Sequence, residues 1–142
     1  MKKQFSLAFI TLFVALFVSS APALATQYIS AAEVKQMIEE NKAMVLVDIQ
    51  PEEEFNRHHI VGAVPTYAFP AKSKADRLKL APLAKKLRDT DETIVVVCPR
   101  GGGGAKNTYS YLLESGIAEG RLFILTQGQA GWPYPELLEQ NQ

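Results

Sequence analysis

The chain has 142 residues, of which 47% are hydrophobic and 21% are charged, with 15 basic and 15 acidic side chains. This length suits one domain with a removable terminal segment, and the composition excludes a disordered, collagen-like or disulfide-stapled chain. Zero net charge gives no electrostatic case for nucleic-acid binding. A single cysteine excludes an internal disulfide and a structural zinc site built on paired thiolates.

Residues 1–25 are predicted to be a secretory signal peptide. Two lysines precede an uncharged apolar run from Phe5 to Val18, and Ala23 and Ala25 then form a small-residue cleavage site. The alternative is an uncleaved membrane anchor, but the apolar run is shorter than the roughly 20 residues that a bilayer span needs. Cleavage after Ala25 leaves residues 26–142 as the domain, and it predicts a periplasmic protein with no membrane span.

The rest of the chain alternates predicted strands and helices. Ser30 and Glu33 have the spacing of a capping box that begins a helix reaching about Asn41. Two continuous apolar runs, residues 43–48 and 93–98, are typical of strands buried on both faces. The other predicted elements are a short strand at Tyr28-Ile29, a helix beginning at Pro51, a short strand at 60–64, an amphipathic helix within 72–88, a helix at 105–115 ended by Gly116, a strand at 121–125, and a terminal helix or turn at 133–140.

This alternation predicts an α/β fold, with a parallel sheet covered by helices on both faces. Ligands of such folds bind beyond the carboxyl ends of the strands. Asp48 and Cys98 each end one of the two apolar runs. We therefore expect both residues at the same edge of the sheet.

The loop after Cys98 predicts a reactive thiol. Cys98 is followed by a proline, an arginine, four glycines and a helix, and glycines allow successive backbone N–H groups to point inward as an anion nest. The predicted donors are the amides of Arg100, Gly101, Gly102, Gly103, Gly104 and Ala105, aided by the positive end of the helix. These donors are expected to favour the thiolate form of Cys98. The alternative is a flexible glycine hinge beside an inert, buried thiol.

Three segments resemble the signatures of the rhodanese-like family. In chain order they are Asp48 to Phe55 followed by His59 to Ala63, then Val95 to Cys98, and finally Leu125 to Gly128 with Trp132. Each is weak alone, but three in order over about residues 28–138 are specific. The resemblance implies a rhodanese-like five-stranded parallel sheet flanked by helices on both faces, and sulfur transfer through a persulfide on Cys98.

The resemblance also implies that Asp48 supports the active-site loop by accepting hydrogen bonds. Its position just before Pro51 equally suits a cap for the following helix. The chain departs from the family pattern at four places: Gln50 stands where an arginine is usual, His58 stands where a glycine is usual, Gly103 and Gly104 take the place of the arginine before the helix, and the loop is one residue longer than in typical sulfurtransferases. A polysulfide or persulfide is therefore expected to be a better donor than thiosulfate, a doubly charged oxyanion that benefits from a fixed cation.

The leading hypothesis is an exported sulfurtransferase that acts on a small sulfur-containing donor and acceptor, with neither a metal nor an organic cofactor. A carrier or binding module that takes up sulfur without turnover is the alternative on the same fold. A thiol–disulfide oxidoreductase is disfavoured because Cys98 has no resolving cysteine. The adjacent His58 and His59 point in different directions and make a poor metal pair, so structural hydrogen bonding is predicted for them.

Overall fold

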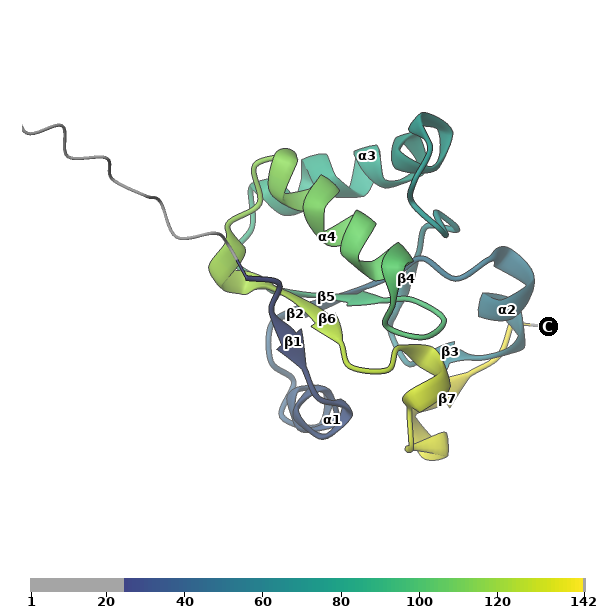
Figure 1. Cartoon of the computed structure of the whole chain (residues 1–142). Helices are drawn as coiled ribbons and strands as arrows, with labels where there is room; N and C mark the ends of the chain where they lie inside the picture. The colour runs from purple at the N-terminus through teal and green to yellow at the C-terminus, as the bar shows by residue number, and fades with distance from the viewer. Residues whose placement is uncertain (1–24, 142) are drawn as a thin grey trace, which may run out of the picture.

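The computed structural model describes residues 25–141 (Figure 1). The predicted signal peptide, apart from Ala25, lies outside the described residues. The strands are β1 (Tyr28–Ile29), β2 (Met44–Asp48), β3 (His59–Ile60), β4 (Val64–Pro65), β5 (Thr93–Val97), β6 (Leu122–Leu125) and β7 (Leu138–Glu139). The helices are α1 (Ala31–Glu39), α2 (Glu52–Arg57), α3 (Lys74–Arg88) and α4 (Gly103–Glu114), with short 3-10 helices η1 (Glu119–Arg121), η2 (Gln129–Gly131) and η3 (Pro135–Leu137).

The main sheet has five strands in the order β1-β6-β5-β2-β4, and every neighbouring pair is parallel. This confirms the predicted five-stranded parallel sheet. The two long apolar strands lie side by side at its centre, with Val47 opposite Val96 and Asp48 opposite Val97. The carboxyl ends of β2 and β5 therefore meet at one edge, as the sequence predicts.

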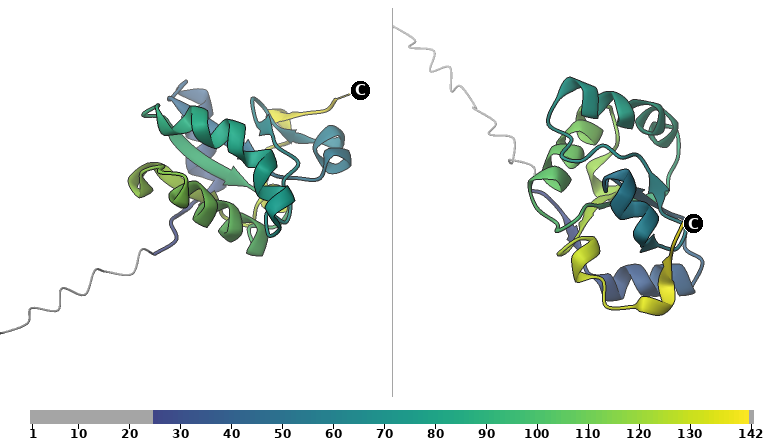
Figure 2. Two further views of the ribbon diagram at one scale, coloured as in Figure 1. Left: turned by 90° about the horizontal axis from the view of Figure 1, so that it is seen from above. Right: turned by 90° about the vertical axis from the view of Figure 1, so that its right-hand side faces the viewer.

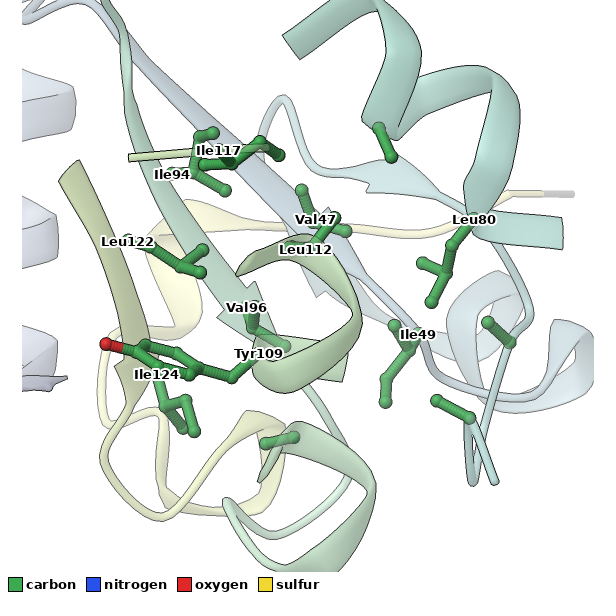
Figure 3. Close-up of a cluster of buried hydrophobic side chains, with 14 of the residues drawn as sticks. Val47, Ile49, Leu80, Ile94, Val96, Tyr109, Leu112, Ile117, Leu122 and Ile124 are labelled. Atoms are coloured by element: carbon green, nitrogen blue, oxygen red, sulfur yellow. The ribbon is translucent and has the colours of Figure 1, made fainter. Parts of the chain in front are cut away.

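Helices cover both faces of the sheet and create two hydrophobic cores. On one face α3 and α4 lie side by side, and α1 lies on the other (Figures 1 and 2). Figure 3 shows the larger core, where Leu80 of α3 and Leu112 of α4 pack over Val47 and Val96. The smaller core joins Val34 of α1 to the opposite face of the sheet, and it includes Trp132.

The capping chemistry of the helices explains where they begin. Ser30 forms the predicted capping box with Glu33 at the start of α1, and Ser73 forms a second one with Asp76 at the start of α3. Pro51 is the N-cap residue of α2, so the helix begins at Glu52, one residue later than the start at Pro51 that the sequence predicts. Among the helices of residues 25–141, none has the length and apolar character needed to cross a bilayer.

The prediction of one short strand at 60–64 is wrong, because a turn divides this segment into two strands. Gly62 has a φ of +76°, a left-handed conformation that glycine adopts readily, and the Ala63 N–H donates to the Ile60 carbonyl across this turn. The part before the turn, β3, leaves the main sheet and pairs antiparallel with β7. The part after it, β4, forms an edge of the main sheet beside β2.

Two other boundaries differ from the prediction. Helix α4 begins at Gly103, two residues before the predicted start, so half of the glycine run is helical. The segment at 133–140 contains η3, but it then ends in β7, whose hydrogen-bonded partner β3 lies about 80 residues earlier and leaves no local signal. The C-terminal segment lies on the same side of the sheet as α1 (Figure 2, right).

Candidate functional site

Cys98 is the first residue beyond β5 and lies at the carboxyl edge of the sheet. Cys98 is 2% exposed, and its side chain belongs to the larger core, which also contains Ile49 and Ala105. The Sγ atom accepts a hydrogen bond from the backbone N–H of Gly101 at 2.8 Å. The loop thus folds back so that one of its own amides faces the sulfur.

The glycine run after Cys98 divides into a loop and a helix start. The loop comprises residues 98–102, and Gly102 is the N-cap residue of α4 without a side-chain cap. Gly103, Gly104 and Ala105 form the first turn of the helix, where backbone N–H groups have no partner within the helix. Of the predicted nest, therefore, the Gly101 amide contacts the sulfur directly, and the first-turn amides supply the positive helix end.

Gly101 and Gly128 pack backbone against backbone. Gly101 has a φ of +73°, and a Cβ added to it would lie 2.8 Å from the Gln127 backbone nitrogen. Gly128 has a φ of +59°, and a Cβ there would overlap the Cys98 carbonyl oxygen and lie 2.6 Å from the Gly101 nitrogen. Only glycine fits both the dihedral angle and the space at these two positions.

Backbone hydrogen bonds fasten the Cys98 loop to η2. The Gln129 N–H donates to the Cys98 carbonyl at 2.8 Å, and the Ala130 N–H donates to the Pro99 carbonyl at 3.0 Å. Both carbonyls lie in the short stretch between β5 and α4. Residues 128–130 therefore fix the backbone from which the Cys98 side chain projects.

Asp48 lies at the same sheet edge as Cys98, but its side chain is on the other face. Successive residues of a strand alternate faces, and Asp48 is in register with Val97, whose side chain packs in the smaller core. Asp48 is fully buried, and its two carboxylate oxygens accept from Gln50, one from the backbone N–H at 2.8 Å and one from the side-chain amide at 3.0 Å. Asp48 fills neither predicted role directly. Its side chain forms no hydrogen bond with the Cys98 loop, and it does not cap α2.

The contact of Asp48 with the loop runs through two glutamines. The Gln50 side-chain amide also donates to Oε1 of Gln129, at 3.5 Å, and the backbone of Gln129 holds the Cys98 carbonyl. Burial raises the pKa of Asp48 to about 6, although the hydrogen bonds from Gln50 and the nearby His59 oppose the rise. Gln50, which replaces the arginine of the family pattern, brings no positive charge to this carboxylate.

Arg100 lies on the surface of the loop. Within residues 25–141 no hydrogen bond or ion pair holds its guanidinium group, and the residue is exposed. It is therefore the one loop cation of the described chain that a ligand at Cys98 could recruit without breaking an existing pair.

His59 has the structural role that the sequence predicts for the two histidines. The His59 ring stacks on Phe55 with centroids 3.8 Å apart, and its Nδ1 lies 2.9 Å from the Phe55 carbonyl oxygen. Its Nε2 lies 3.5 Å from a carboxylate oxygen of Glu139 in β7. In the described part of the chain, no group of three or more His, Cys, Asp or Glu side chains is placed to hold a metal ion.

Three residues near Cys98 were not predicted as site residues. Gly128 and Gln129 hold the loop, and Phe69 packs its ring against Gly104, where an added Cβ would lie 2.8 Å from the ring. The sequence carried a signal for Gly128 alone, since the segment Leu125 to Gly128 is one of the family signatures. Phe69 lies in a segment without periodicity, and its contact with α4 depends on the three-dimensional fold alone.

The comparison with protein families gives one match. The family model described as the rhodanese-like domain matches residues 30–133, which include the whole Cys98 loop, Asp48 and residues 128–130. No curated protein sequence matches the chain.

Solved structures share the fold at low sequence identity. Saccharomyces cerevisiae Ygr203w, described as a homolog of single-domain rhodanese and of the Cdc25 phosphatase catalytic domain, has 17% identity and a TM-score of 0.63, over 82% of this chain and 89% of that chain. An As-Sb reductase from Leishmania major has 15% identity and a TM-score of 0.65, over 82% and 86%. A rhodanese-related protein from Thermoplasma volcanium has 19% identity and a TM-score of 0.55, over 75% and 89%.

Proposed function

The chain belongs to the rhodanese-like family, and from this premise we propose that it is a sulfurtransferase that carries a sulfane sulfur as a persulfide on Cys98. The observation that carries the proposal is the hydrogen bond from the Gly101 N–H to Sγ, made at the N-terminal end of α4. Amide donors and a positive helix end stabilise negative charge on sulfur, and the thiolate is the nucleophilic form of cysteine.

The proposed reaction has two displacement steps. In the first, the Cys98 thiolate attacks the outer sulfur of the donor, so that a bond from Sγ to that sulfur forms while the S–S bond of the donor breaks. The electron pair of the broken bond leaves with the donor fragment, which is sulfite from thiosulfate and a shorter chain from polysulfide. In the second, an acceptor nucleophile takes the outer sulfur, and the electron pair returns to Sγ as the thiolate.

The chain's own groups have separate roles in these steps. The Gly101 amide holds the charge on Sγ, and the first-turn amides of Gly103, Gly104 and Ala105 are available to the outer sulfur of the persulfide. Residues 128–130 keep the loop backbone in place while charge moves along the S–S bond. Because these donors are fixed in the folded chain, no reorganisation is needed when the charge develops.

The proposed donor is a polysulfide or a persulfide rather than thiosulfate. Residues 98–105 contain one cation, the exposed Arg100, and backbone amides supply the other donors. Hydrogen bonds to charged donors are about twice as strong as neutral ones, so a compact dianion loses most from the lack of a fixed cation. The same argument disfavours phosphate and arsenate esters as substrates.

Intact-mass measurement after exposure to thiosulfate, and separately to polysulfide, tests this function. We expect one added sulfur atom, absent in Cys98→Ser and removed by cyanide. Repeated cycles with free donor and cyanide then distinguish an enzyme, which turns over, from a carrier, which takes up sulfur once and stops. A native protein that gains no mass with either donor would exclude both readings.

We also propose that the protein acts outside the cytoplasm. The support is the sequence pattern of residues 1–25, with its basic start, apolar run and small-residue cleavage site. Expression of the full chain in a bacterium, followed by N-terminal sequencing of the periplasmic fraction, should find Thr26 as the first residue. Protein that keeps residues 1–25 and stays with the cytoplasmic or membrane fraction would contradict the proposal.

A further inference from the structure

A basic groove lies between the start of α3 and the C-terminal half of α4, away from the Cys98 loop. It has a volume of about 360 Å³ and is lined by Lys72, Lys74, Arg77, Leu78 and Tyr111. Three of these five side chains are cationic. The other two are apolar or aromatic, and Leu78 is 62% exposed, the most exposed large hydrophobic residue of the described chain.

Two of the three cations of the groove are unpaired. Within residues 25–141, the side chains of Lys72 and Lys74 form no ion pair, whereas the guanidinium group of Arg77 lies over the Tyr111 ring, 5.8 Å from its centroid. Arg77 pairs with Glu114 at 3.3 Å, but both side chains are more than a third exposed, so this pair adds little stability. Asp76, the other nearby acid, is occupied as the capping partner of Ser73.

Residues 69–72 follow one side of α4 from its first turn, beside the Cys98 loop, to the groove. Phe69 packs against Gly104 in the first turn, and the Asn107 side chain donates to the Pro70 carbonyl one turn later at 3.1 Å. Tyr111, one further turn along, lines the groove. Positions three and four residues apart share a helix face, so these contacts form a continuous track.

The apolar surface of this track continues almost to the active site. Phe69 is 40% exposed although it packs on the first turn of the helix that follows the Cys98 loop. Gly104 and Tyr111 are seven positions apart, which corresponds to about 10 Å along the helix axis. An extended polypeptide covers that distance in about three residues.

We propose that this groove docks an acidic segment of the protein that accepts sulfur from Cys98. Carboxylates of the partner would pair with Lys72, Lys74 and Arg77, and its apolar side chains would cover Leu78. A small inorganic anion would satisfy the cations and leave the apolar side chains exposed, whereas a polypeptide can fill the groove and still place a nucleophile at Cys98. This proposal rests on the proposed function, because it names the class of acceptor for the same persulfide.

The test uses a synthetic acceptor peptide in which the spacing between the cysteine and the acidic segment matches the distance from the first turn of α4 to the groove. It has one cysteine, a spacer of three glycines and a run of alternating glutamate and leucine, and its control has glutamine in place of glutamate. The variant Lys72→Ala/Lys74→Ala removes two groove charges, and Lys85→Ala/Lys86→Ala removes two exposed charges from the other end of the same helix. Persulfide transfer to the peptide, transfer to cyanide, and binding of the dye-labelled peptide to unloaded protein are measured on each.

We expect the groove variant to bind the acidic peptide, and to transfer sulfur to it, about tenfold less well than native protein, with transfer to cyanide unchanged. The control variant should behave like native protein, and added salt should erase the preference for glutamate. Equal losses in both variants, or equal use of the two peptides, would overturn the proposal, as would self-association that depends on Lys72 and Lys74. Groove-dependent binding without any sulfur transfer would instead retain the docking surface and reject the sulfurtransferase.

Discussion

Gly128 lies directly against the carbonyl oxygen of Cys98, so closely that a Cβ atom at residue 128 would overlap it. The two residues are 30 positions apart and come from different connections, one after β5 and one after β6. The neighbouring Gln129 N–H donates a hydrogen bond to the same carbonyl. Residues 128 and 129 therefore both exclude a side chain at this contact and hold the backbone of Cys98 in place. The direction in which the Cys98 side chain points depends on it.

Gly128→Ala should therefore disturb the site more than an ordinary surface substitution does. The new Cβ meets backbone atoms that cannot rotate away, and alanine is strained at a φ of +59°. We expect a loss of about 2–3 kcal/mol in the free energy of unfolding, with a large loss of persulfide formation. Urea unfolding and intact mass measure these two effects. Gly120→Ala, where an added Cβ has nothing within 4 Å, is the matched control and should change neither.

Two glycines of the Cys98 run should respond to alanine in opposite directions. Gly101 has a positive φ and faces the Gln127 backbone, so Gly101→Ala should destabilise the chain by more than about 1 kcal/mol and slow sulfur uptake. Gly103 is helical with open space around its Cα, so Gly103→Ala should stabilise the chain by up to about 1 kcal/mol. Unfolding curves of the two variants provide the comparison. Equal effects of one sign would mean that the run is a uniform flexible hinge.

Asp48 should make stability depend on pH in an unusual direction for a carboxylate. Burial raises its pKa from 3.8 to about 6, so between those values the folded chain holds a proton that the unfolded chain has released. The stability contributed by Asp48 is complete below about pH 4 and is lost, by roughly 3 kcal/mol in total, as the pH rises through about 6. Above about pH 7 this contribution no longer changes.

The Asp48→Asn variant has an uncharged amide at this position at every pH. Comparison with it separates the titration of Asp48 from that of the other carboxylates. The free energy of unfolding of native protein, minus that of the variant, should fall as the pH rises from 4 to 7. Urea titrations at several pH values measure it. A difference that is constant with pH would show that the carboxylate titrates alike in the folded and unfolded chains.

Arg100→Ala tests how the site handles oxyanions. If the exposed guanidinium folds over the loop when a donor binds, thiosulfate turnover should fall well below that of the native protein, and polysulfide turnover should change little. Steady-state rates with the two donors are measured for each variant. The control is Lys106→Ala, which removes an exposed cation from α4, the helix that follows the loop. Efficient thiosulfate turnover in both variants would show that amides alone suffice and that the proposed donor ranking is wrong.

Elements with local chemical signals were predictable from the sequence. The apolar runs gave β2 and β5, and the Ser30 capping box gave the start of α1. The Cys98 loop was recognisable because a cysteine, a proline and a glycine run occur together. The start of α4 was misplaced because glycine has low helix propensity, and packing against Phe69 favours helix there.

Elements that depend on distant partners were not predictable. β3 is an isolated pair of residues whose strand conformation exists only beside β7. The hydrogen bond between Gln50 and Gln129 joins residues 79 positions apart, and no spacing rule connects them. Nor does the sequence place Phe69 beside α4.

The pairing of β1 with β6 and of β3 with β7 has a consequence for how the chain acquires its structure. Both pairings join segments far apart in the sequence, and domains dominated by such pairings fold slowly. A nascent chain that has not yet reached Leu138 lacks the partner of β3, so the β3–β7 pair forms only after that residue has been made. If the chain is exported as proposed, we expect these late pairings to form after the polypeptide has crossed the membrane.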